Sequence, residues 1–366
     1  MSLPDHPQVQ PTCVRPQGAH LVGSTTFDDC GSTFRTTTSV LGSRLKRVPD
    51  GEVGERFHWI AFQPNRLSAT VGLERVGDTP IVINPGAPVE LDVRQLRLTP
   101  GTDASALELP SLGYADAAID SWAEFERLRT EGIIPAQTRF MVALPTPLAT
   151  VSSFIWTDDR PAVEPVYEAA LALELDRILT AIPHDSLAIQ WDCAVEFGFL
   201  ESADAYRVGA FEPWWEDLFG GLIERAARQA GRVPDSVELG FHLCYGDSGE
   251  KHFIEPKDAS NLVKFANALV KASPRALQFL HLPVPIERDD SEYFSPLAGL
   301  ELSEGTELYL GLVHREDGVA GAERRIAAAA QFVSAFGVST ECGFGRAPKD
   351  QTVPLLETHA AVSVGW

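Results

Sequence analysis

Positive charge, cysteine and long apolar runs are all scarce in this sequence. Its 366 residues include 30 Lys and Arg against 51 Asp and Glu, which gives a formal net charge of −21. Phosphate backbones and anionic membrane surfaces repel a protein of this charge, so we expect no nucleic acid partner. No run approaches the roughly 20 apolar residues that a membrane-spanning helix needs, and we expect no membrane association.

The first residues lack the features of an export signal. The segment 1–10 is polar and rich in Pro, with neither a basic start nor an apolar stretch of signal-peptide length. We therefore expect a cytoplasmic protein. Residues 1–18 should form a flexible N-terminal segment and residues 19–366 a single catalytic domain, because no low-complexity linker divides the chain.

The few cysteines are odd in number and far apart in the sequence. They are Cys13, Cys30, Cys193, Cys244 and Cys342. Disulfide frameworks are typical of small secreted chains with even, closely spaced sets of cysteines. The pattern here favours reduced thiols, some of which could hold a metal ion.

Strand-like and helix-like segments alternate along most of the chain, which indicates an α/β fold. Short apolar runs such as 138–144 and 186–192 predict strands, whereas longer runs with helical spacing, such as 163–182, predict helices. The first strand is expected at 20–25. We count about eight strands, for which the economical fold is a single (β/α)8 TIM barrel. Alternating runs within 73–98 predict a β-hairpin inserted after the second strand.

A doubly wound open sheet is the alternative arrangement of the same elements. Dinucleotide-binding sheets of that kind carry a Gly-x-Gly-x-x-Gly sequence at a strand-to-helix joint. The predicted joints of this chain have none. The barrel is therefore the better prediction.

The most informative predicted strand is 237–246, which contains His242-Leu243-Cys244. Side chains two apart on a strand share a face, so His242 and Cys244 would project together. Imidazole and thiolate are ligands that zinc favours. His281 and Cys342 each lie where a short apolar run meets Pro or Gly, and they could complete a tetrahedral site. A buried core pair is the alternative interpretation, since free Cys is among the most buried residues.

Other polar residues also follow predicted strands. The catalytic groups of a TIM barrel come from the C-terminal ends of several strands, where this sequence places Ser24, Glu52, Asp192 and His314. Each has a structural alternative: Asp192 could cap a helix, Glu52 could be a solvated loop acid, and His314 could be a buried imidazole with a backbone partner. Taken with the cysteines, the set favours a metal site.

The motifs around the cysteines resemble those of the zinc-bearing catalytic barrel of cobalamin-independent methionine synthase, in the superfamily that includes uroporphyrinogen decarboxylase. His242-Leu-Cys-Tyr245 is similar to that family's His-x-Cys-Tyr zinc motif, and Glu341-Cys-Gly343 is similar to its Asp-Cys-Gly zinc motif. The resemblance implies zinc held by His242, Cys244 and Cys342. It also places His281 on the strand that supplies a glutamate ligand in the family.

Weaker matches imply further roles. Val22-Gly-Ser24 resembles the family's Ile-Gly-Ser strand end, which binds the amino acid substrate, and Glu52 matches the substrate-binding acid of its His-Gly-Glu loop. Ile189-Gln-Trp-Asp192 is similar to Ile-Gln-Ile-Asp, which implies that Asp192 contacts the substrate amine. Val313-His314 lies where the family has an Ile-His thought to deliver a proton.

The sequence also departs from that family. Asp192 is followed by Cys193-Ala-Val in place of Glu-Pro-Ala, and the chain is long enough for one barrel where the synthase has two. A polyanionic folate would also meet a strongly acidic protein. We therefore do not expect methionine synthesis itself.

The function predicted by these motifs is zinc-dependent transfer of a methyl or alkyl group to a small-molecule thiol. A zinc-dependent lyase or hydrolase of a small polar metabolite is one alternative, and a non-catalytic small-molecule binder is another. A metal-free decarboxylase is the weakest, because it gives no reason to gather His242, Cys244 and Cys342. The sequence indicates neither the methyl donor nor the oligomeric state.

Overall fold

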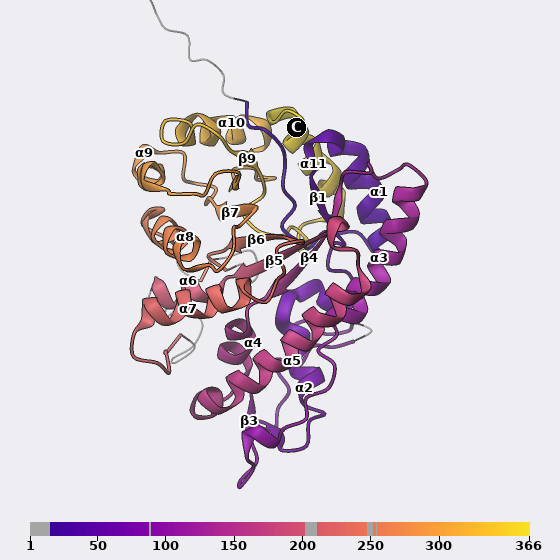
Figure 1. Ribbon diagram of the computed structural model, residues 1–366, viewed down its shortest axis with the longest axis vertical. Coiled ribbons are helices and arrows are strands. Elements are labelled where there is room, and N and C mark those ends of the chain that lie inside the picture. Colours follow the sequence, from indigo (N-terminus) through magenta and orange to yellow (C-terminus); the bar gives the residue numbers. More distant parts are fainter. Residues whose placement is uncertain (1–14, 88, 202–210, 247–251, 254) are drawn as a thin grey trace, which may run out of the picture.

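The computed structural model describes residues 15–87, 89–201, 211–246, 252–253 and 255–366. Helices surround a curled parallel sheet (Figure 1). Within the described ranges, no helix is both long and apolar enough to cross a bilayer. Of the expected N-terminal segment, residues 1–14 lie outside the described residues, whereas the N–H of Gln17 donates to the carbonyl of Phe336 at 3.0 Å.

The described chain forms a main sheet of seven strands in the order β1-β4-β5-β6-β7-β8-β9, and every neighbouring pair is parallel. The strands are β1 Arg47–Pro49, β4 Arg139–Pro145, β5 Leu187–Cys193, β6 Glu238–Leu243, β7 Phe279–Pro283, β8 Glu307–Gly311 and β9 Gly337–Val338. All seven residues of β5 are buried. Five of these residues are apolar, the exceptions being Gln190 and Asp192. Buried, mostly apolar runs of this kind are why sequence pattern locates the central strands well.

The sheet curls into a half-barrel and does not close as an eight-strand barrel. The predicted first strand, 20–25, is irregular. Just before it, Ala19 forms an isolated bridge with Val338 of β9, and its N–H donates to the carbonyl of Arg44 at 2.9 Å. The chain around residue 19 therefore lies near both edge strands of the sheet, β1 and β9, but forms no continuous ladder of strand hydrogen bonds with either.

Residues 20–25 do not form a regular strand because part of their backbone bonds to groups outside the edge strands. The carbonyl of Val22 accepts a hydrogen bond from the side-chain amide of Gln190 at 2.7 Å. The N–H of Thr25 donates to the carbonyl of Gly51 at 3.0 Å. The predicted (β/α)8 barrel is therefore confirmed only as a TIM-barrel-like α/β fold with seven strands in the described sheet. The prediction of a first strand at 20–25 is wrong.

Helices pack outside the sheet, with α3 and α5 along one flank and α7 and α8 along another (Figure 1). The helices are α1 Cys30–Leu41, α2 Gln63–Leu67, α3 Tyr114–Thr130, α4 Pro147–Phe154, α5 Arg160–Ala181, α6 Val195–Leu200, α7 Leu218–Ala230, α8 Ser260–Ala272, α9 Ser291–Phe294, α10 Gly318–Ala329 and α11 Thr352–Val362.

Helix α1 was not expected, because its sequence is rich in Thr. Asp29 caps it by accepting the N–H of Ser32 at 2.7 Å, and the hydroxyl of Thr37 donates to the carbonyl of Thr33 at 2.7 Å. Its buried face includes Phe34 and Leu41 together with three threonines. Capping and burial outweigh the weak helix propensity of threonine.

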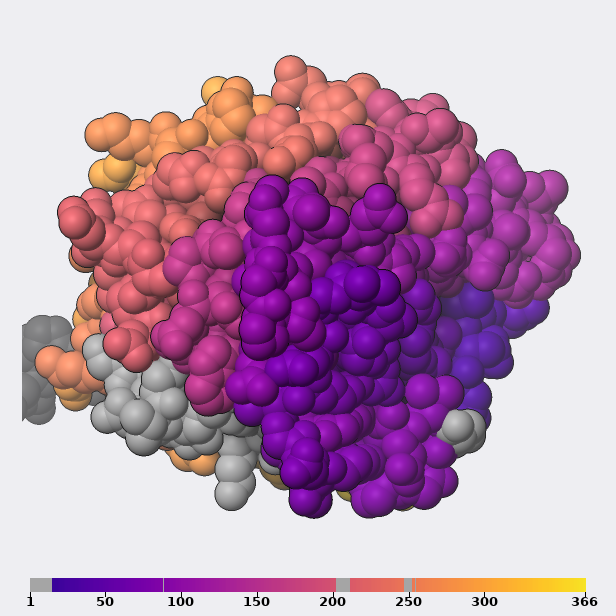
Figure 2. Space-filling view, turned by 90° about the horizontal axis from the view of Figure 1, so that it is seen from below, coloured from indigo at the N-terminus to yellow at the C-terminus, as the bar shows by residue number. Residues whose placement is uncertain are grey.

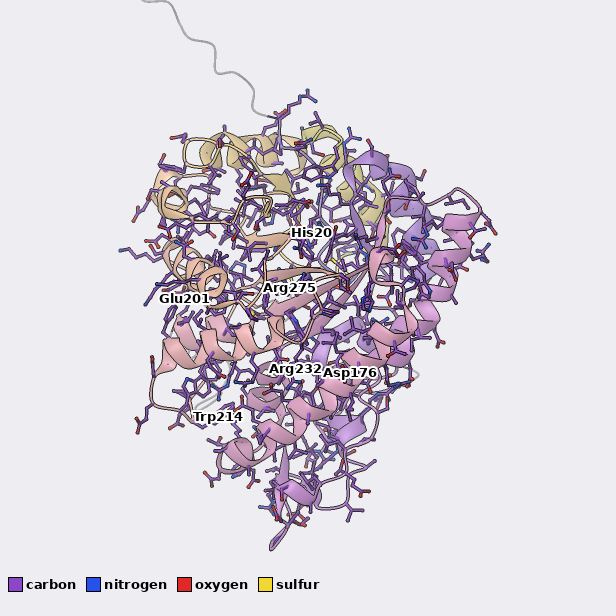
Figure 3. All side chains as sticks on the ribbon, viewed as in Figure 1. His20, Asp176, Glu201, Trp214, Arg232 and Arg275 are labelled. Atoms are coloured by element: carbon purple, nitrogen blue, oxygen red, sulfur yellow. The ribbon has the colours of Figure 1, made fainter. Side chains whose placement is uncertain are left out.

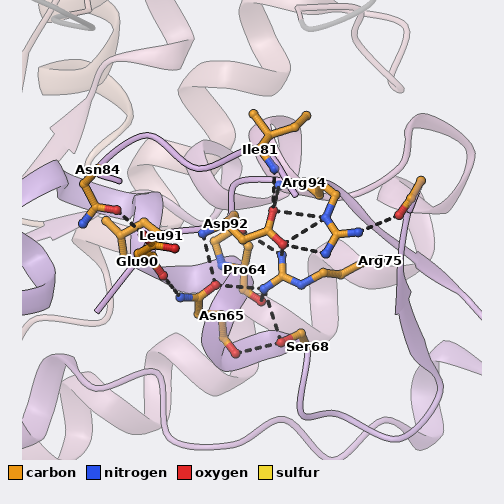
Figure 4. Close-up of polar contacts among 11 residues, drawn as sticks. Pro64, Asn65, Ser68, Arg75, Ile81, Asn84, Glu90, Leu91, Asp92 and Arg94 are labelled. Carbon is orange, nitrogen blue, oxygen red and sulfur yellow. Dashed lines mark hydrogen bonds and ion pairs between the residues drawn. The ribbon is translucent and has the colours of Figure 1, made fainter. Parts of the chain in front are cut away.

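A β-hairpin lies within 73–98 as predicted, but it follows the first strand of the main sheet, β1, and not a second one. Strands β2 (Leu73–Arg75) and β3 (Leu96–Leu98) pair antiparallel, and β3 lies at the end of the molecule farthest from α10 (Figure 1). Seen from below, the purple residues around this insertion form the middle of the surface (Figure 2). Asp92 anchors it, because its carboxylate accepts hydrogen bonds from Arg94 and from the N–H of Ile81 (Figure 4).

Candidate metal centre

Two cysteines and one histidine from distant parts of the chain meet at the C-terminal end of the curled sheet. His242 and Cys244 come from β6 and the residue after it, and Cys342 follows β9. Ligand atoms of the three residues all lie within 4.8 Å of one another. No other group of this kind occurs in the described part of the chain.

The sulfur atoms have the separation that a shared tetrahedral ion requires. Cys244 Sγ and Cys342 Sγ lie 3.7 Å apart, and both residues are free thiols. Two sulfurs bonded to a tetrahedral zinc ion at about 2.3 Å would lie about 3.8 Å apart. The donor set and its spacing therefore fit zinc.

Strand register explains why these side chains converge. Across β5, β6 and β7, Asp192 pairs with His242, and His242 pairs with His281. Paired residues of neighbouring parallel strands project from the same face of a sheet, so the three side chains form one row. The N–H of Cys244 continues the pairing by donating to the carbonyl of Cys193 at 2.9 Å.

His281 lies beside this ligand group and is not a member of it. Its Nδ1 lies 2.7 Å from Nδ1 of His242, and its Nε2 lies 3.0 Å from the carbonyl oxygen of Thr340. Both ring nitrogens therefore have partners. Nε2 of His242 is buried and has no hydrogen-bond partner, which leaves it available to a metal ion.

The two thiols polarise each other. The contact with Cys342 holds the pKa of the Cys244 thiol well below its usual value, despite burial. The same contact, together with burial, raises the pKa of Cys342. One thiolate is thus favoured even before a cation adds its charge.

A cavity of about 370 Å³ opens directly above the ligand group. Its lining includes Ser24, Glu52, Trp59, Asp192, Cys244 and Arg346, together with apolar side chains of Ile83, Val93, Phe154 and Val195. A mostly apolar pocket with a few converging polar groups is the usual form of a small-molecule site. Six of the predicted site residues line it, namely Ser24, Glu52, Asp192, His242, Cys244 and Cys342.

Glu52 is held in the cavity by a strained backbone. Glu52 and Trp59, with φ of 50° and 53°, are the non-glycine residues with positive φ in the described chain, and both line the cavity. The N–H of Glu52 donates to Asp50, whose carboxylate Arg56 also binds. Strained backbone persists where surrounding structure enforces it, and it gathers at functional sites.

The Glu52 carboxylate lies against Gly23, where an added Cβ would come within 2.9 Å of its Oε1. Burial, reinforced by Asp50, raises the pKa of Glu52 to about 7, although Arg56 opposes the shift. A carboxyl group that titrates near neutral pH can bind a cation or exchange a proton. Ser24 lies next to Gly23, and its hydroxyl accepts the N–H of Gly345 at 3.3 Å.

Asp192 belongs to a hydrogen-bonded chain that begins inside the half-barrel. His20, labelled in Figure 3, has Nε2 at 2.8 Å from Oε1 of Gln190, and the Gln190 amide donates to Asp192 at 2.9 Å. Burial and the nearby Glu52 raise the pKa of Asp192 well above its usual value. These hydrogen bonds orient Asp192 toward the cavity. The next helix, α6, has Ala194 at its N-cap and no side-chain cap, so Asp192 does not cap it.

His314 lines a second cavity, of about 380 Å³, instead of the first. Cys342 and Arg346 line both cavities, so the loop after β9 forms the wall between them. Nε2 of His314 lies 2.9 Å from the carbonyl of Val284, and burial lowers the pKa of His314.

Sequence reasoning missed the roles of Trp59 and of the glycines after Cys342. At Gly343 an added Cβ would meet the Ser24 hydroxyl at 2.3 Å, so only glycine lets the cysteine loop approach Ser24. The two glycines in Cys342-Gly-Phe-Gly-Arg346 were the sequence pattern that could have indicated this close approach. Nothing in the sequence indicates the strained conformation of Trp59.

Comparisons with known proteins show the fold and no more. No family model matches the sequence, and no curated protein matches it. The structure is similar to the "Putative Vitamin-B12 Independent Methionine Synthase" from Listeria monocytogenes, with a TM-score of 0.57, 15% identity, and 95% of this chain and 97% of that chain covered. It is also similar to a methyltransferase from Methanosarcina mazei, with a TM-score of 0.52, 12% identity, and 96% and 95% covered. The chain therefore shares the curled α/β fold of these proteins over nearly its whole length.

Proposed function

We propose that this protein is a zinc-dependent enzyme that transfers a methyl or alkyl group to the sulfur of a small thiol substrate. The observation that carries the proposal is the meeting of His242, Cys244 and Cys342 within 4.8 Å beside a cavity that also holds two carboxyl groups. The likeness in fold to a methyltransferase and to a protein assigned as a methionine synthase supports it.

Zinc, when bound, would coordinate the substrate thiol and lower its pKa, so that a thiolate exists near neutral pH. His242, Cys244 and Cys342 would hold the ion. The substrate sulfur then attacks the methyl carbon, the bond from carbon to the donor atom breaks, and the electron pair leaves with the donor atom.

Glu52 and Asp192 would hold the polar end of the substrate. Both line the cavity with Cys244, and in an apolar setting their carboxylates would bind an ammonium group more strongly than in water. A bound cation would in turn favour their charged forms. Ile83, Phe154 and Val195 give the cavity an apolar wall beside these two carboxyl groups.

The sequence-based assignment of His314 as the proton donor for the departing group stays a prediction. His314 lines the second cavity, and Cys342 lies between that cavity and the first. Burial lowers the pKa of His314.

A zinc-dependent lyase or hydrolase is the second candidate. It is favoured by Glu52, since a carboxyl group with a pKa of about 7 suits a general base. The two candidates differ in whether a thiol is consumed. A non-catalytic binder would have neither activity.

The experiment is to incubate the protein with homocysteine and candidate methyl donors and to follow loss of free thiol. The transferase predicts thiol loss that requires metal and that Cys342→Ser abolishes. Cys30→Ser is the matched control, because Cys30 lies at the start of α1, outside both cavities. Turnover of a substrate without any thiol would contradict the transferase and support the lyase or hydrolase.

A further inference from the structure

We infer that His281 is a positioning residue of the metal centre and not one of its ligands: it accepts the Nδ1–H of His242 and so directs the lone pair of His242 Nε2 at the metal. The inference rests on the proposed metal centre and departs from the expectation that His281 is the fourth ligand. It follows from the hydrogen bonds of two imidazoles.

The first step concerns Nε2 of His281. It lies 3.0 Å from the carbonyl oxygen of Thr340. A carbonyl oxygen only accepts hydrogen bonds, so this nitrogen carries a proton and donates it. The Thr340 hydroxyl donates in turn to the carbonyl of Cys342 at 2.7 Å, which connects His281 to the segment that carries the second thiol.

The second step concerns the charge of His281. Its side chain is fully buried, and the neighbours that contact its ring are His20, His242 and Thr340, none of which is a carboxylate. A buried imidazolium without a counter-charge is strongly disfavoured. His281 is therefore neutral, and Nδ1 has a lone pair.

The third step fixes the tautomer of His242. The two Nδ1 atoms lie 2.7 Å apart, so one of them must carry the shared proton. Because Nδ1 of His281 is the acceptor, Nδ1 of His242 is the donor. Neutral His242 then has its lone pair on Nε2, the buried nitrogen that has no hydrogen-bond partner.

The same distance shows that the two Nδ1 atoms do not bind one metal ion together. Two nitrogens bonded to one tetrahedral zinc ion at about 2.0–2.1 Å would lie about 3.3 Å apart. The observed 2.7 Å between the Nδ1 atoms is a hydrogen-bond distance. A metal-ligating histidine generally donates its other N–H to a partner that fixes the ring, and here the partner is a second histidine.

The test compares His281→Asn with His281→Leu. The amide oxygen of Asn can accept the Nδ1–H of His242, whereas Leu cannot. Zinc affinity, measured by competition with a chelator, should stay near the native value in His281→Asn and fall by about 10–100-fold in His281→Leu. The Co²⁺ spectrum should be the same in the native protein and in His281→Asn. Equal large losses of affinity in both variants, with a changed Co²⁺ spectrum, would overturn the inference and make His281 a ligand.

A second measurement needs no variant and no metal. Long-range ¹H–¹⁵N NMR correlations of the metal-free native protein should show His242 protonated at Nδ1 and unprotonated at Nε2. A proton on Nε2 would overturn the inference even if the variants fold poorly. If the native protein binds no zinc, the proposed function fails; if it binds zinc and His281→Leu binds as tightly, only the role of His281 fails.

Discussion

Cys244 Sγ and Cys342 Sγ lie 3.7 Å apart, although 98 residues separate them in the sequence. Cys244 follows β6 at the centre of the sheet, and Cys342 follows the edge strand β9. Only the curl of the sheet can bring them together. The half-barrel is therefore what makes the candidate metal site, and that site is the basis for each prediction below.

Zinc should stabilise the folded protein. An ion that binds the native state alone adds about 2.7 kcal/mol of stability when its free concentration is 100 times its Kd. The melting temperature should rise on titration with zinc and fall on addition of a chelator. Cys342→Ser should abolish this response, whereas Cys30→Ser should retain it. A response to zinc that survives both Cys342→Ser and Cys244→Ser would place the ion elsewhere.

Substrate binding should depend on the ionisation of Glu52. Burial raises the pKa of Glu52 to about 7, so its carboxylate is present above pH 7 and is lost below. The affinity for an amine-bearing substrate should weaken about tenfold per pH unit well below pH 7. Glu52→Gln should bind weakly and show no such dependence, and isothermal titration from pH 5.5 to 8 measures both. Native affinity that is flat over this range would exclude Glu52 from the contact.

Glu52 also makes a prediction for stability, because its folded-state pKa is above the unfolded value. The charged form is disfavoured in the fold, so Glu52 makes the ligand-free protein less stable as pH rises from about 4.5 to 7. Glu52→Gln should therefore stabilise the ligand-free protein at pH 8 and have little effect at pH 4.5. Urea unfolding at the two pH values measures the difference, and a loss of stability at pH 8 would contradict it.

Asp192→Asn should weaken substrate binding without lowering the stability of the folded protein. The amide oxygen of Asn can still accept the hydrogen bond from Gln190, and burial already favours the neutral form of Asp192. We expect the melting temperature to stay the same or rise. Affinity for a cationic substrate should fall by 10-fold or more, about 1.4 kcal/mol or more. Unchanged affinity in a folded Asp192→Asn protein would show that Asp192 has only a structural role.

The hairpin insertion should influence the cavity, because Ile83 and Val93 line it. The pKa of Asp92 is lowered to about 2, since hydrogen bonds from Arg94 outweigh the opposing effect of burial. Asp92 therefore stabilises the insertion above about pH 4, and the effect is lost as pH falls through 2. Asp92→Asn should increase hydrogen exchange within 73–98, weaken ligand binding and remove about 1–2 kcal/mol of local stability.

The control for the insertion is Glu74→Gln. Glu74 and Arg97 form an ion pair on exposed side chains, which are 40% and 53% accessible. Such pairs contribute about 0–1 kcal/mol. Equal effects of Glu74→Gln and Asp92→Asn would mean that the Asp92 cluster does not hold the insertion in place.

The sequence pattern predicted the row of Asp192, His242 and His281 for a physical reason. Parallel strands buried on both faces are short apolar runs, and polar residues near their ends stand out. Period-two projection then places the side chains on one face. Cys342 was found because it is a cysteine next to glycine after a short strand.

Other features depend on tertiary contacts that no local pattern encodes. The partner of His281 is set by ring orientation inside the half-barrel, and His314 faces the second cavity because the loop of Cys342 separates the two. Ser24 reaches the site from an irregular segment whose backbone bonds Gln190 and Gly51. The composition of residues 20–25 resembles that of a strand, so local pattern alone predicts a strand there.

X-ray absorption at the zinc edge, on protein purified in the presence of zinc, tests the central claim most directly. The account predicts one zinc ion per chain with two sulfur ligands at about 2.3 Å and one imidazole nitrogen at about 2.0–2.1 Å. Cys244→Ser and Cys342→Ser should each remove one sulfur. Protein that holds no stoichiometric zinc, or zinc bound without sulfur, would contradict the account.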